Sequence, residues 1–149
     1  MITKKHVTWA AICVTCVAGF EGLRTVAYRD PVSIPTICYG ETLGVKMGDR
    51  KTEYECKTML TSRLEQFNRG VDKCIRVPMS ESRRAAMVSF SYNVGTGAFC
   101  KSTLARKLNA GDPKACDELL KWDKAGGLPL PGLTRRRIAE RTLCNQAAP

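Results

Sequence analysis

The chain has 149 residues, and its 24 lysines and arginines against 14 aspartates and glutamates give a formal net charge of +10. Hydrophobic residues make up 44% of the sequence, which is usual for a folded protein and too high for a disordered tail. A length of ~150 residues is typical of one domain with its own core, so we expect a single domain over residues 1–149. No apolar run approaches the ~20 residues that span a bilayer comfortably.

The positive charge favours a polyanionic partner: nucleic acid, an anionic membrane or a bacterial envelope. The basic residues are spread along the chain and are not interleaved with aromatic residues, and the sequence carries no zinc-finger or RRM signature. We therefore expect no nucleic-acid partner. Any single basic cluster is most simply interpreted as a solvated surface.

Eight cysteines are many for so short a chain. The only C-x-x-C motif is Cys13 with Cys16 in an apolar stretch, and the only histidine is His6, so the pattern of a zinc site is missing. We expect most cysteines to form disulfides, which places the working protein in an oxidising compartment without a metal or other cofactor.

A small β-hairpin lobe is predicted over residues 21–50. Val26 and Tyr28 alternate with their neighbours, as do Ile37 and Tyr39, and glycines and prolines punctuate the stretch. This pattern indicates two or three short strands joined by turns.

Helical patterns dominate from residue 51 to the end of the chain. Thr52, followed three residues later by Glu55, forms a capping box. Helices are predicted over 52–71, 80–94, 102–108, 112–122 and 134–144, with a loop over 125–132. The fold class is therefore α+β and mostly helical, with a ligand cleft expected between the lobe at 21–50 and the helical lobe at 51–149.

Three polar residues in the irregular stretch could do chemistry. Glu21 follows the apolar run, Asp30 lies nine residues later in a turn, and Thr36 lies six beyond that at the start of the next strand. A glutamate at the end of a buried helix is partly desolvated, which suits a general acid, whereas an aspartate in a solvated turn stays ionised and can act as a base. Glycoside hydrolysis requires two such carboxylates in unlike environments. The spacing alone favours structural roles: a glutamate at a helix C-terminus, an aspartate that starts a turn and a threonine in a strand.

The surrounding sequence resembles a known family. The stretch FEGLRTVAYRDPVSIPTICYGET, from Phe20 to Thr42, resembles the active-site segment of phage-type lysozymes, the muramidases of glycoside hydrolase family 24. Further similarity lies in residues 89–99, 102–112, 122 and 132–141. The resemblance implies a lysozyme-like fold whose β-hairpin and helical lobes flank a cleft. It also implies an endolysin that hydrolyses the β-1,4 bond between N-acetylmuramic acid and N-acetylglucosamine in peptidoglycan, by an inverting mechanism, for host cell lysis.

The resemblance assigns a role to each candidate. Glu21 would protonate the leaving oxygen, Asp30 would activate the attacking water, and Thr36 would help to place that water. An inverting enzyme leaves room for the water, so the two carboxyl groups are expected ~6.5–9.5 Å apart. The family also pairs its acid with an arginine of the last helix, and Arg135 matches that position best among three consecutive arginines.

The sequence departs from the family pattern at two places. Many relatives have a histidine after the strand glycine where this chain has Glu41, so an ion pair made by that histidine would be lost or reversed. The stretch 123–131 also looks longer than in minimal members. Trp122 is interpreted as a core aromatic and not as a sugar platform.

The apolar run Val7–Phe20 follows a basic stretch at residues 4–6, as a secretory signal does. A cleaved signal fits poorly, because removal near Gly19 would leave Glu21 at a frayed end. Some relatives carry an uncleaved signal-anchor-release segment, which this run resembles. It is therefore either the first helix of the fold or a releasable membrane anchor.

Eight cysteines allow roughly a hundred pairings, so composition alone does not fix the connectivity. Positions along the chain suggest Cys116 with Cys144, one before the 125–132 loop and one on the helix after it. Pairings of Cys38 with Cys56 and of Cys74 with Cys100 are also suggested. Cys13 and Cys16 remain, either paired together, free or exchanging.

Two alternatives to the hydrolase stay open. A lytic transglycosylase cleaves the same bond but needs only the acid, which Asp30 and Thr36 argue against. A non-catalytic cationic envelope-binding protein would not need Glu21. For the hydrolase we expect a monomer, made in the host cytoplasm and acting on periplasmic peptidoglycan glycan strands, with transient inner-membrane association before release if residues 7–20 are an anchor.

Overall fold

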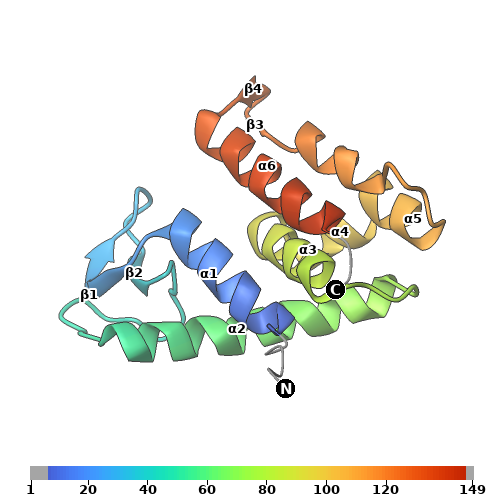
Figure 1. Cartoon of the computed structure of the whole chain (residues 1–149). Helices are drawn as coiled ribbons and strands as arrows, with labels where there is room; N and C mark the ends of the chain where they lie inside the picture. Colours follow the sequence, from blue (N-terminus) through green and yellow to red (C-terminus); the bar gives the residue numbers. More distant parts are fainter. Residues whose placement is uncertain (1–6, 147–149) are drawn as a thin grey trace, which may run out of the picture.

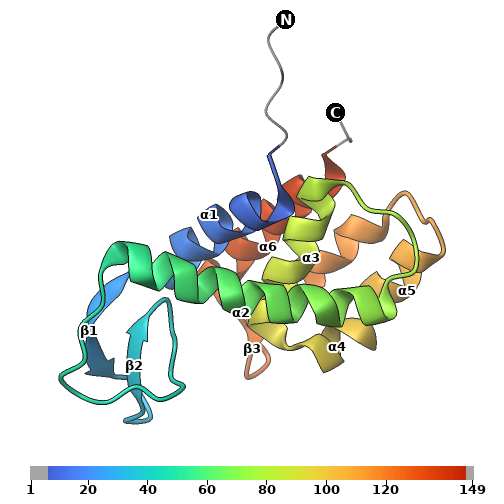
Figure 2. The same cartoon turned by 90° about the horizontal axis from the view of Figure 1, so that it is seen from below.

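The computed structural model describes residues 7–146, so the predicted basic stretch at 4–6 lies outside the described residues. Figures 1 and 2 show a small β lobe on one side and a group of packed helices on the other, with α1 and α2 reaching both. The elements in chain order are α1 (Trp9–Glu21), β1 (Arg24–Arg29), β2 (Pro35–Cys38), α2 (Glu53–Cys74), α3 (Glu81–Val94), α4 (Thr96–Cys100), α5 (Thr103–Asn109), the 3₁₀-helix η1 (Ala115–Lys121), β3 (Lys124–Ala125), β4 (Leu128–Pro129) and α6 (Pro131–Asn145). The predicted α+β, mostly helical fold class is confirmed.

The predicted hairpin is present as β1 and β2, which pair antiparallel. Arg24 lies opposite Cys38 and Tyr28 lies opposite Thr36, with an irregular register between the two pairs. The loop after β2 returns to the hairpin, because Val26 forms an isolated bridge with Arg50. The β lobe is thus a two-stranded hairpin closed by one long loop.

Hydroxyl side chains cap four of the helices at their N-termini. Thr8, Thr52, Ser80 and Ser102 precede α1, α2, α3 and α5, and each accepts a hydrogen bond from a backbone N–H three residues on. The predicted capping box at Thr52 is complete, since the Glu55 side chain also accepts from the Thr52 N–H. These caps satisfy otherwise unpaired donors, which explains why the sequence located the helix starts well.

The segment from Asp112 differs from the predicted α-helix. Backbone bonds run from Ala115 N to Asp112 O and from Asp117 N to Lys114 O, an i to i+3 spacing, so η1 is a 3₁₀-helix that begins at Ala115. The Asp112 side chain accepts from Lys114 N at 2.8 Å and bends the chain before the helix starts.

The predicted loop at 125–132 contains the small hairpin of β3 and β4. Gly126 and Gly127 form its turn with φ of 58° and 81°, a conformation that favours glycine at both positions. The next helix, α6, then begins at Pro131, earlier than predicted, since a proline is well tolerated in the first turn. The five-residue helix α4 was not predicted, because it is too short to show a helical period.

Helix α3 lies at the centre of the molecule, in contact with α1, α2, α4 and α6 (Figure 1). Seven consecutive residues, from Ala85 to Ser91, are buried. A helix buried on all sides must carry small or apolar residues around its whole circumference, which this stretch does. Trp122 packs edge-on against Phe90 at 5.2 Å between ring centroids, as predicted for a core aromatic.

Three disulfides staple this arrangement, and all three predicted pairings are confirmed. They are Cys38–Cys56, Cys74–Cys100 and Cys116–Cys144. The first ties the β lobe to α2, the second ties α2 to α4, and the third ties η1 to α6. Cys13 and Cys16 are free thiols.

The apolar run Val7–Phe20 was predicted to be either the first helix of the fold or a releasable membrane anchor. In this structure it forms the first helix, α1. Cys13 and Val17 of α1 are fully buried against the core. Within residues 7–146, no helix combines the length and the apolar character needed to cross a membrane.

Candidate active site

Glu21 is the last residue of α1. The next residue, Gly22, has φ of 72° and donates its N–H to Ala18 O at 3.2 Å, which ends the helix and turns the chain toward β1. A left-handed residue at this place favours glycine. The Glu21 side chain keeps 28% of its exposure, so it lies where the sequence predicted, at the end of an apolar helix and partly desolvated.

The arginine that reaches Glu21 is Arg136, so the prediction of Arg135 was wrong by one residue. Arg136 Nη1 donates to Glu21 Oε1 at 2.8 Å. Arg135 is exposed, and its guanidinium folds back over Gly132. One residue turns a helix by ~100°, so only one of two adjacent arginines can face α1.

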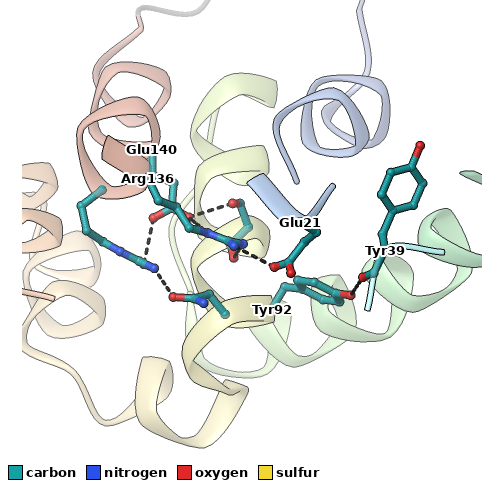
Figure 3. A network of polar contacts seen from close by, with 8 residues as sticks. Glu21, Tyr39, Tyr92, Arg136 and Glu140 are labelled. Atoms are coloured by element: carbon teal, nitrogen blue, oxygen red, sulfur yellow. Dashed lines mark hydrogen bonds and ion pairs between the residues drawn. The ribbon is translucent and has the colours of Figure 1, made fainter. Parts of the chain in front are cut away.

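A buried polar network continues from Arg136 into the helical lobe (Figure 3). Glu140 accepts from Arg136 Nε at 3.2 Å and from Ser89 Oγ at 2.8 Å through Oε1, and from Arg137 Nη1 at 3.0 Å through Oε2. Arg136 Nη2 donates to Ser89 O, and its guanidinium lies 4.9 Å from the ring centroid of Phe20. This network was not predicted from the sequence. A signal was available in the spacing, because Glu140 follows Arg137 by three residues and Arg136 by four, which places all three on one face of a helix. A serine in the predicted apolar helix over 80–94, Ser89, offered a partner.

Asp30 and Thr36 are joined through a single residue, Ile34. Asp30 Oδ1 accepts from the N–H groups of Val32 and Ile34 at 2.9 and 2.8 Å. Ile34 O accepts from Asp30 N at 3.0 Å and from Thr36 Oγ1 at 2.9 Å. The structure thus places Asp30 in the hairpin turn and Thr36 near the start of β2, as predicted, with both side chains fixed to one backbone unit.

The end of β2 brings the hairpin to Glu21. A Cβ at Gly40 would lie 3.8 Å from Glu21 Oε2, so the glycine leaves the carboxylate uncovered on that side. Tyr92 of α3 fixes this chain segment, because its hydroxyl donates to Tyr39 O at 3.1 Å (Figure 3). Burial raises the pKa of Tyr92 to about 12, with the charges of Glu21 and Glu41 adding to the effect. The separation of ~6.5–9.5 Å between the Glu21 and Asp30 carboxyls stays a prediction.

Glu41, the residue that departs from the family pattern, pairs with Arg63 of α2 through a 3.3 Å contact between Oε2 and Nε. Its Oε1 accepts from the N–H groups of Thr42 and Leu43, both at 3.0 Å. The acidic residue at this position therefore has a basic partner in this chain. It fixes the loop after β2 to α2.

A hollow of about 610 Å³ adjoins Glu21 on the α6 side. It is lined by the end of α1 and the start of α6, at Gly19, Phe20, Leu130, Gly132, Leu133, Arg135 and Arg136. Asp30 and Thr36 are not among these residues. Within residues 7–146 no three His, Cys, Asp or Glu residues are grouped to hold a metal ion.

The sequence of this chain matches a known protein family. Residues 18–140 match the model of the family described as phage lysozyme. The chain belongs to the phage lysozyme family. It is 45% identical over 128 residues to a SAR-endolysin of Bacteriophage PS119, covering 85% of this chain and 77% of the relative.

Two solved structures agree with this membership. A mutant of P22 lysozyme superposes with a TM-score of 0.86 and 33% identity, covering 95% of this chain and all of the other. An endolysin from Escherichia coli O157:H7 phage FAHEc1 superposes with a TM-score of 0.85 and 30% identity, covering 98% and 99%. The lysozyme fold predicted from the sequence is therefore confirmed, and this phage lysozyme is an enzyme, a glycoside hydrolase of the muramidase class.

Proposed function

We propose that this muramidase lyses the host cell by hydrolysing the β-1,4 bond between N-acetylmuramic acid and N-acetylglucosamine with inversion. Glu21 is the general acid, Asp30 is the general base, and Thr36 orients the attacking water. The observation that carries the proposal is the unlike surroundings of the two carboxylates. Glu21 sits at a helix end against Arg136, while Asp30 sits in a turn fixed by backbone donors.

Glu21 protonates the leaving glycosidic oxygen and becomes a carboxylate in the same step. Arg136 supports this change in two ways. Its 2.8 Å bond to Oε1 fixes the side chain and leaves Oε2, on the Gly40 side, to face the sugar. The guanidinium charge then stabilises the carboxylate that forms.

Thr36 and Asp30 can hold a water between them. A carbonyl oxygen only accepts, so the Thr36 hydroxyl must donate its hydrogen to Ile34 O, and it offers only lone pairs to a water. Asp30 Oδ1 already accepts two backbone N–H groups, and no described residue donates to Oδ2. A water that donates one hydrogen to Thr36 and the other to Asp30 Oδ2 keeps a lone pair free for the anomeric carbon.

Turbidity loss of permeabilised Gram-negative cells tests the proposal. Glu21→Gln keeps the shape of the side chain and removes the proton, so the rate should fall at least ~100-fold. Glu65→Gln on α2 is the matched control and should keep wild-type activity. Activity of Glu21→Gln within a few-fold of wild type contradicts the mechanism and favours a non-catalytic cationic envelope-binding protein.

Product analysis separates hydrolysis from transglycosylation, the second candidate on the same bond. Hydrolysis adds water and gives reducing N-acetylmuramic acid ends, whereas a transglycosylase forms 1,6-anhydro ends. The turn in which Asp30 and Thr36 are both bonded to Ile34 supports hydrolysis. Anhydro ends in a mass spectrum of the wild-type digest contradict the assignment of Asp30.

We also propose that the enzyme acts as a monomer on periplasmic peptidoglycan, after synthesis in the host cytoplasm and export through the α1 segment. The name of the PS119 relative, a SAR-endolysin, supports this interpretation, as does the apolar composition of Trp9–Phe20. The segment would first be held in the inner membrane and then leave it to pack as α1. The net charge of +10 would assist binding to the anionic envelope.

A further inference from the structure

Two arginines and one glutamate of α6 are buried together behind Glu21. The side chains of Arg137 and Glu140 are fully buried, and that of Arg136 is 5% exposed. Charged side chains are rarely buried so completely unless they are paired, and a buried ionic group is seldom the most stable way to fill a core. Packing alone therefore gives no reason for this trio.

The trio holds one positive charge in excess. Both oxygens of Glu140 accept charge-assisted bonds, Oε1 from Arg136 and Oε2 from Arg137, as a carboxylate does. One anion thus faces two cations. Another nitrogen of the Arg136 guanidinium, Nη1, points out of the core and donates to Glu21. Glu21 is the carboxylate that meets the excess charge.

Arg137 does not touch Glu21. It donates to Glu140 and to Asn93 Oδ1, and its guanidinium lies 4.8 Å from the ring centroid of Phe90. Arg137 can therefore act on Glu21 only through the long-range electrostatic field of its positive charge. The negative charge of Glu140 offsets that field. Glu140 also holds Arg136 at Nε, which is the far side of the guanidinium from Glu21.

We propose that Glu140 is a positioning residue of the general-acid site: it fixes the Arg136 guanidinium against Glu21 and offsets the charge of Arg137. The inference rests on the proposed role of Glu21 as the acid. Without Glu140, Arg136 loses the acceptor at Nε and keeps only its contacts with Ser89 O and Phe20, and Glu21 faces two buried positive charges. A carboxyl group in a more positive field gives up its proton at lower pH, so less of the enzyme holds the catalytic proton.

Other ionisable groups around the site leave this balance intact. Tyr92 stays neutral because burial raises its pKa to about 12, and burial raises the pKa of the thiols of Cys13 and Cys16 as well. Burial also raises the pKa of Glu140 itself, and Arg137 and Arg136 oppose that rise. Among the other charged groups near the site or α6, Glu41 is paired with Arg63 and Asp117 with Arg141. Arg83 donates to Cys144 O of α6, and Arg135 is exposed at the hollow. Both arginines keep their charge across the pH range of the test below.

The test is Glu140→Gln in the full chain, assayed for kcat and KM on soluble, uncross-linked glycan strands across pH 4–9. We expect kcat to fall roughly tenfold while KM stays within about twofold, because the substrate does not touch Glu140. The alkaline limb of the pH–rate profile, which reports loss of the acid's proton, should move down by roughly one pH unit.

Glu118→Gln is the matched control. Glu118 is also a nearly buried carboxylate between two cations, Lys107 at 2.7 Å and Lys121 at 3.0 Å, but it lies on η1. Its replacement should lower the melting temperature and leave the pH–rate profile in place. A merely structural role for Glu140 predicts the same behaviour for both variants.

The double variant Arg137→Met with Glu140→Gln keeps the inference testable if Glu140→Gln folds poorly. It restores the single excess charge of the wild-type trio without leaving Arg137 unpaired. The alkaline limb should return to within about 0.3 units of wild type, while kcat stays low because Arg136 Nε remains unanchored. An unshifted limb in Glu140→Gln, or a limb that stays shifted in the double variant, overturns the inference. An active Glu21→Gln enzyme instead overturns the proposed function, on which this inference rests.

Discussion

Glu21 and Arg136 lie 115 positions apart in the sequence and are joined by a 2.8 Å hydrogen bond. One belongs to the first helix and the other to the last, so the proposed acid is assembled only when α1 is packed against the helical lobe. Phe20 strengthens this dependence, because the Arg136 guanidinium also lies over its ring. Under the proposed mechanism, docking of α1 is therefore a condition for activity and not only for stability.

Asp30→Asn should separate the proposed role of Asp30 as a base from its role in holding the hairpin turn. The amide oxygen can still accept the backbone bonds from Val32 and Ile34 that Oδ1 accepts now, so the hairpin turn and the melting temperature should be nearly unchanged. Loss of the base should lower the rate of turbidity loss at least ~100-fold.

Asp49→Asn is the matched control for this substitution. Asp49 also sits in a turn of the β lobe, where its Oδ2 accepts from Lys46 N at 2.9 Å. Its amide variant should lyse cells at the wild-type rate. If the Asp30 and Asp49 variants are equally active, Asp30 is not the base.

The sequence predicted best where the local signal is strong. Hydroxyl caps located the starts of α2, α3 and α5. The family resemblance pointed to Glu21, Asp30 and Thr36 through short-range motifs, and the structure places these residues at the predicted helix end and hairpin, while their catalytic roles stay predictions. The disulfides were also predictable, since each joins consecutive or neighbouring elements. None of these inferences required knowledge of how distant helices pack.

Features set by tertiary packing could not be predicted in the same way. Which of three consecutive arginines faces Glu21 depends on the rotation of α6 about its axis, and this follows from its contacts with α1 and α3. The pattern of Arg136, Arg137 and Glu140 would be a solvated face on most helices, yet here it is buried against Ser89. The nature of η1 depended on a local turn at Asp112 that competes with the α-helix.

Tyr92 should make the protein less stable at alkaline pH. Its pKa in the folded state is raised to about 12 by burial, against about 10 in the unfolded chain. A group whose pKa is raised in the folded state contributes its full stabilisation of the folded protein at pH values below its pKa in the unfolded chain. For Tyr92 this contribution is lost as the pH rises from 10 to 12. The free energy of unfolding should therefore fall by about 1 kcal/mol more between pH 9 and 11 in wild type than in Tyr92→Phe.

Urea unfolding at the two pH values measures this difference. Tyr54→Phe is the control, because Tyr54 is 80% exposed and its variant should show the same alkaline loss of stability as wild type. Equal alkaline losses in wild type, Tyr92→Phe and Tyr54→Phe would show that Tyr92 does not resist ionisation in the folded protein.

Gly70→Ala should destabilise the protein although alanine is the better helix former. Gly70 lies in α2, and a Cβ there would come within 2.5 Å of Thr96 Cγ2 and 2.9 Å of its Oγ1. The helix preference of alanine is worth about 1 kcal/mol, and overpacking of this kind costs about 1–3 kcal/mol. Thermal unfolding should show a net loss.

Thr96→Ala should rescue that loss, because it removes both close atoms and leaves a contact of 3.3 Å to Cβ. Gly97→Ala tests the same change where a Cβ meets nothing within 4 Å, and it should stay within about 0.5 kcal/mol of wild type. Additive effects of the Gly70 and Thr96 substitutions would contradict a direct clash.

The thiols of Cys13 and Cys16 should report whether α1 is packed. Cys13 is buried and Cys16 is partly buried. Burial raises the pKa of both thiols, so few of them are thiolates at pH 8. Intact mass after brief iodoacetamide treatment should show almost no labelling of native protein and two labels after unfolding in urea without reductant. Equal labelling in the two states would mean that α1 is not held against the core.

Fractionation of cells that express the full chain tests the proposed anchor. While residues 7–20 are held in the membrane, Glu21 stays at the bilayer surface, away from Arg136 of the helical lobe, so the membrane fraction should lack lytic activity. The segment is short and carries Thr8, Thr15 and Gly19, which weaken its hold on hydrocarbon. Collapse of the membrane potential with an uncoupler should therefore release it, and active enzyme should appear in the periplasmic fraction. Enzyme that is soluble and active in the cytoplasm from the start, with no membrane-bound fraction, would rule out the anchor and leave α1 as an ordinary first helix.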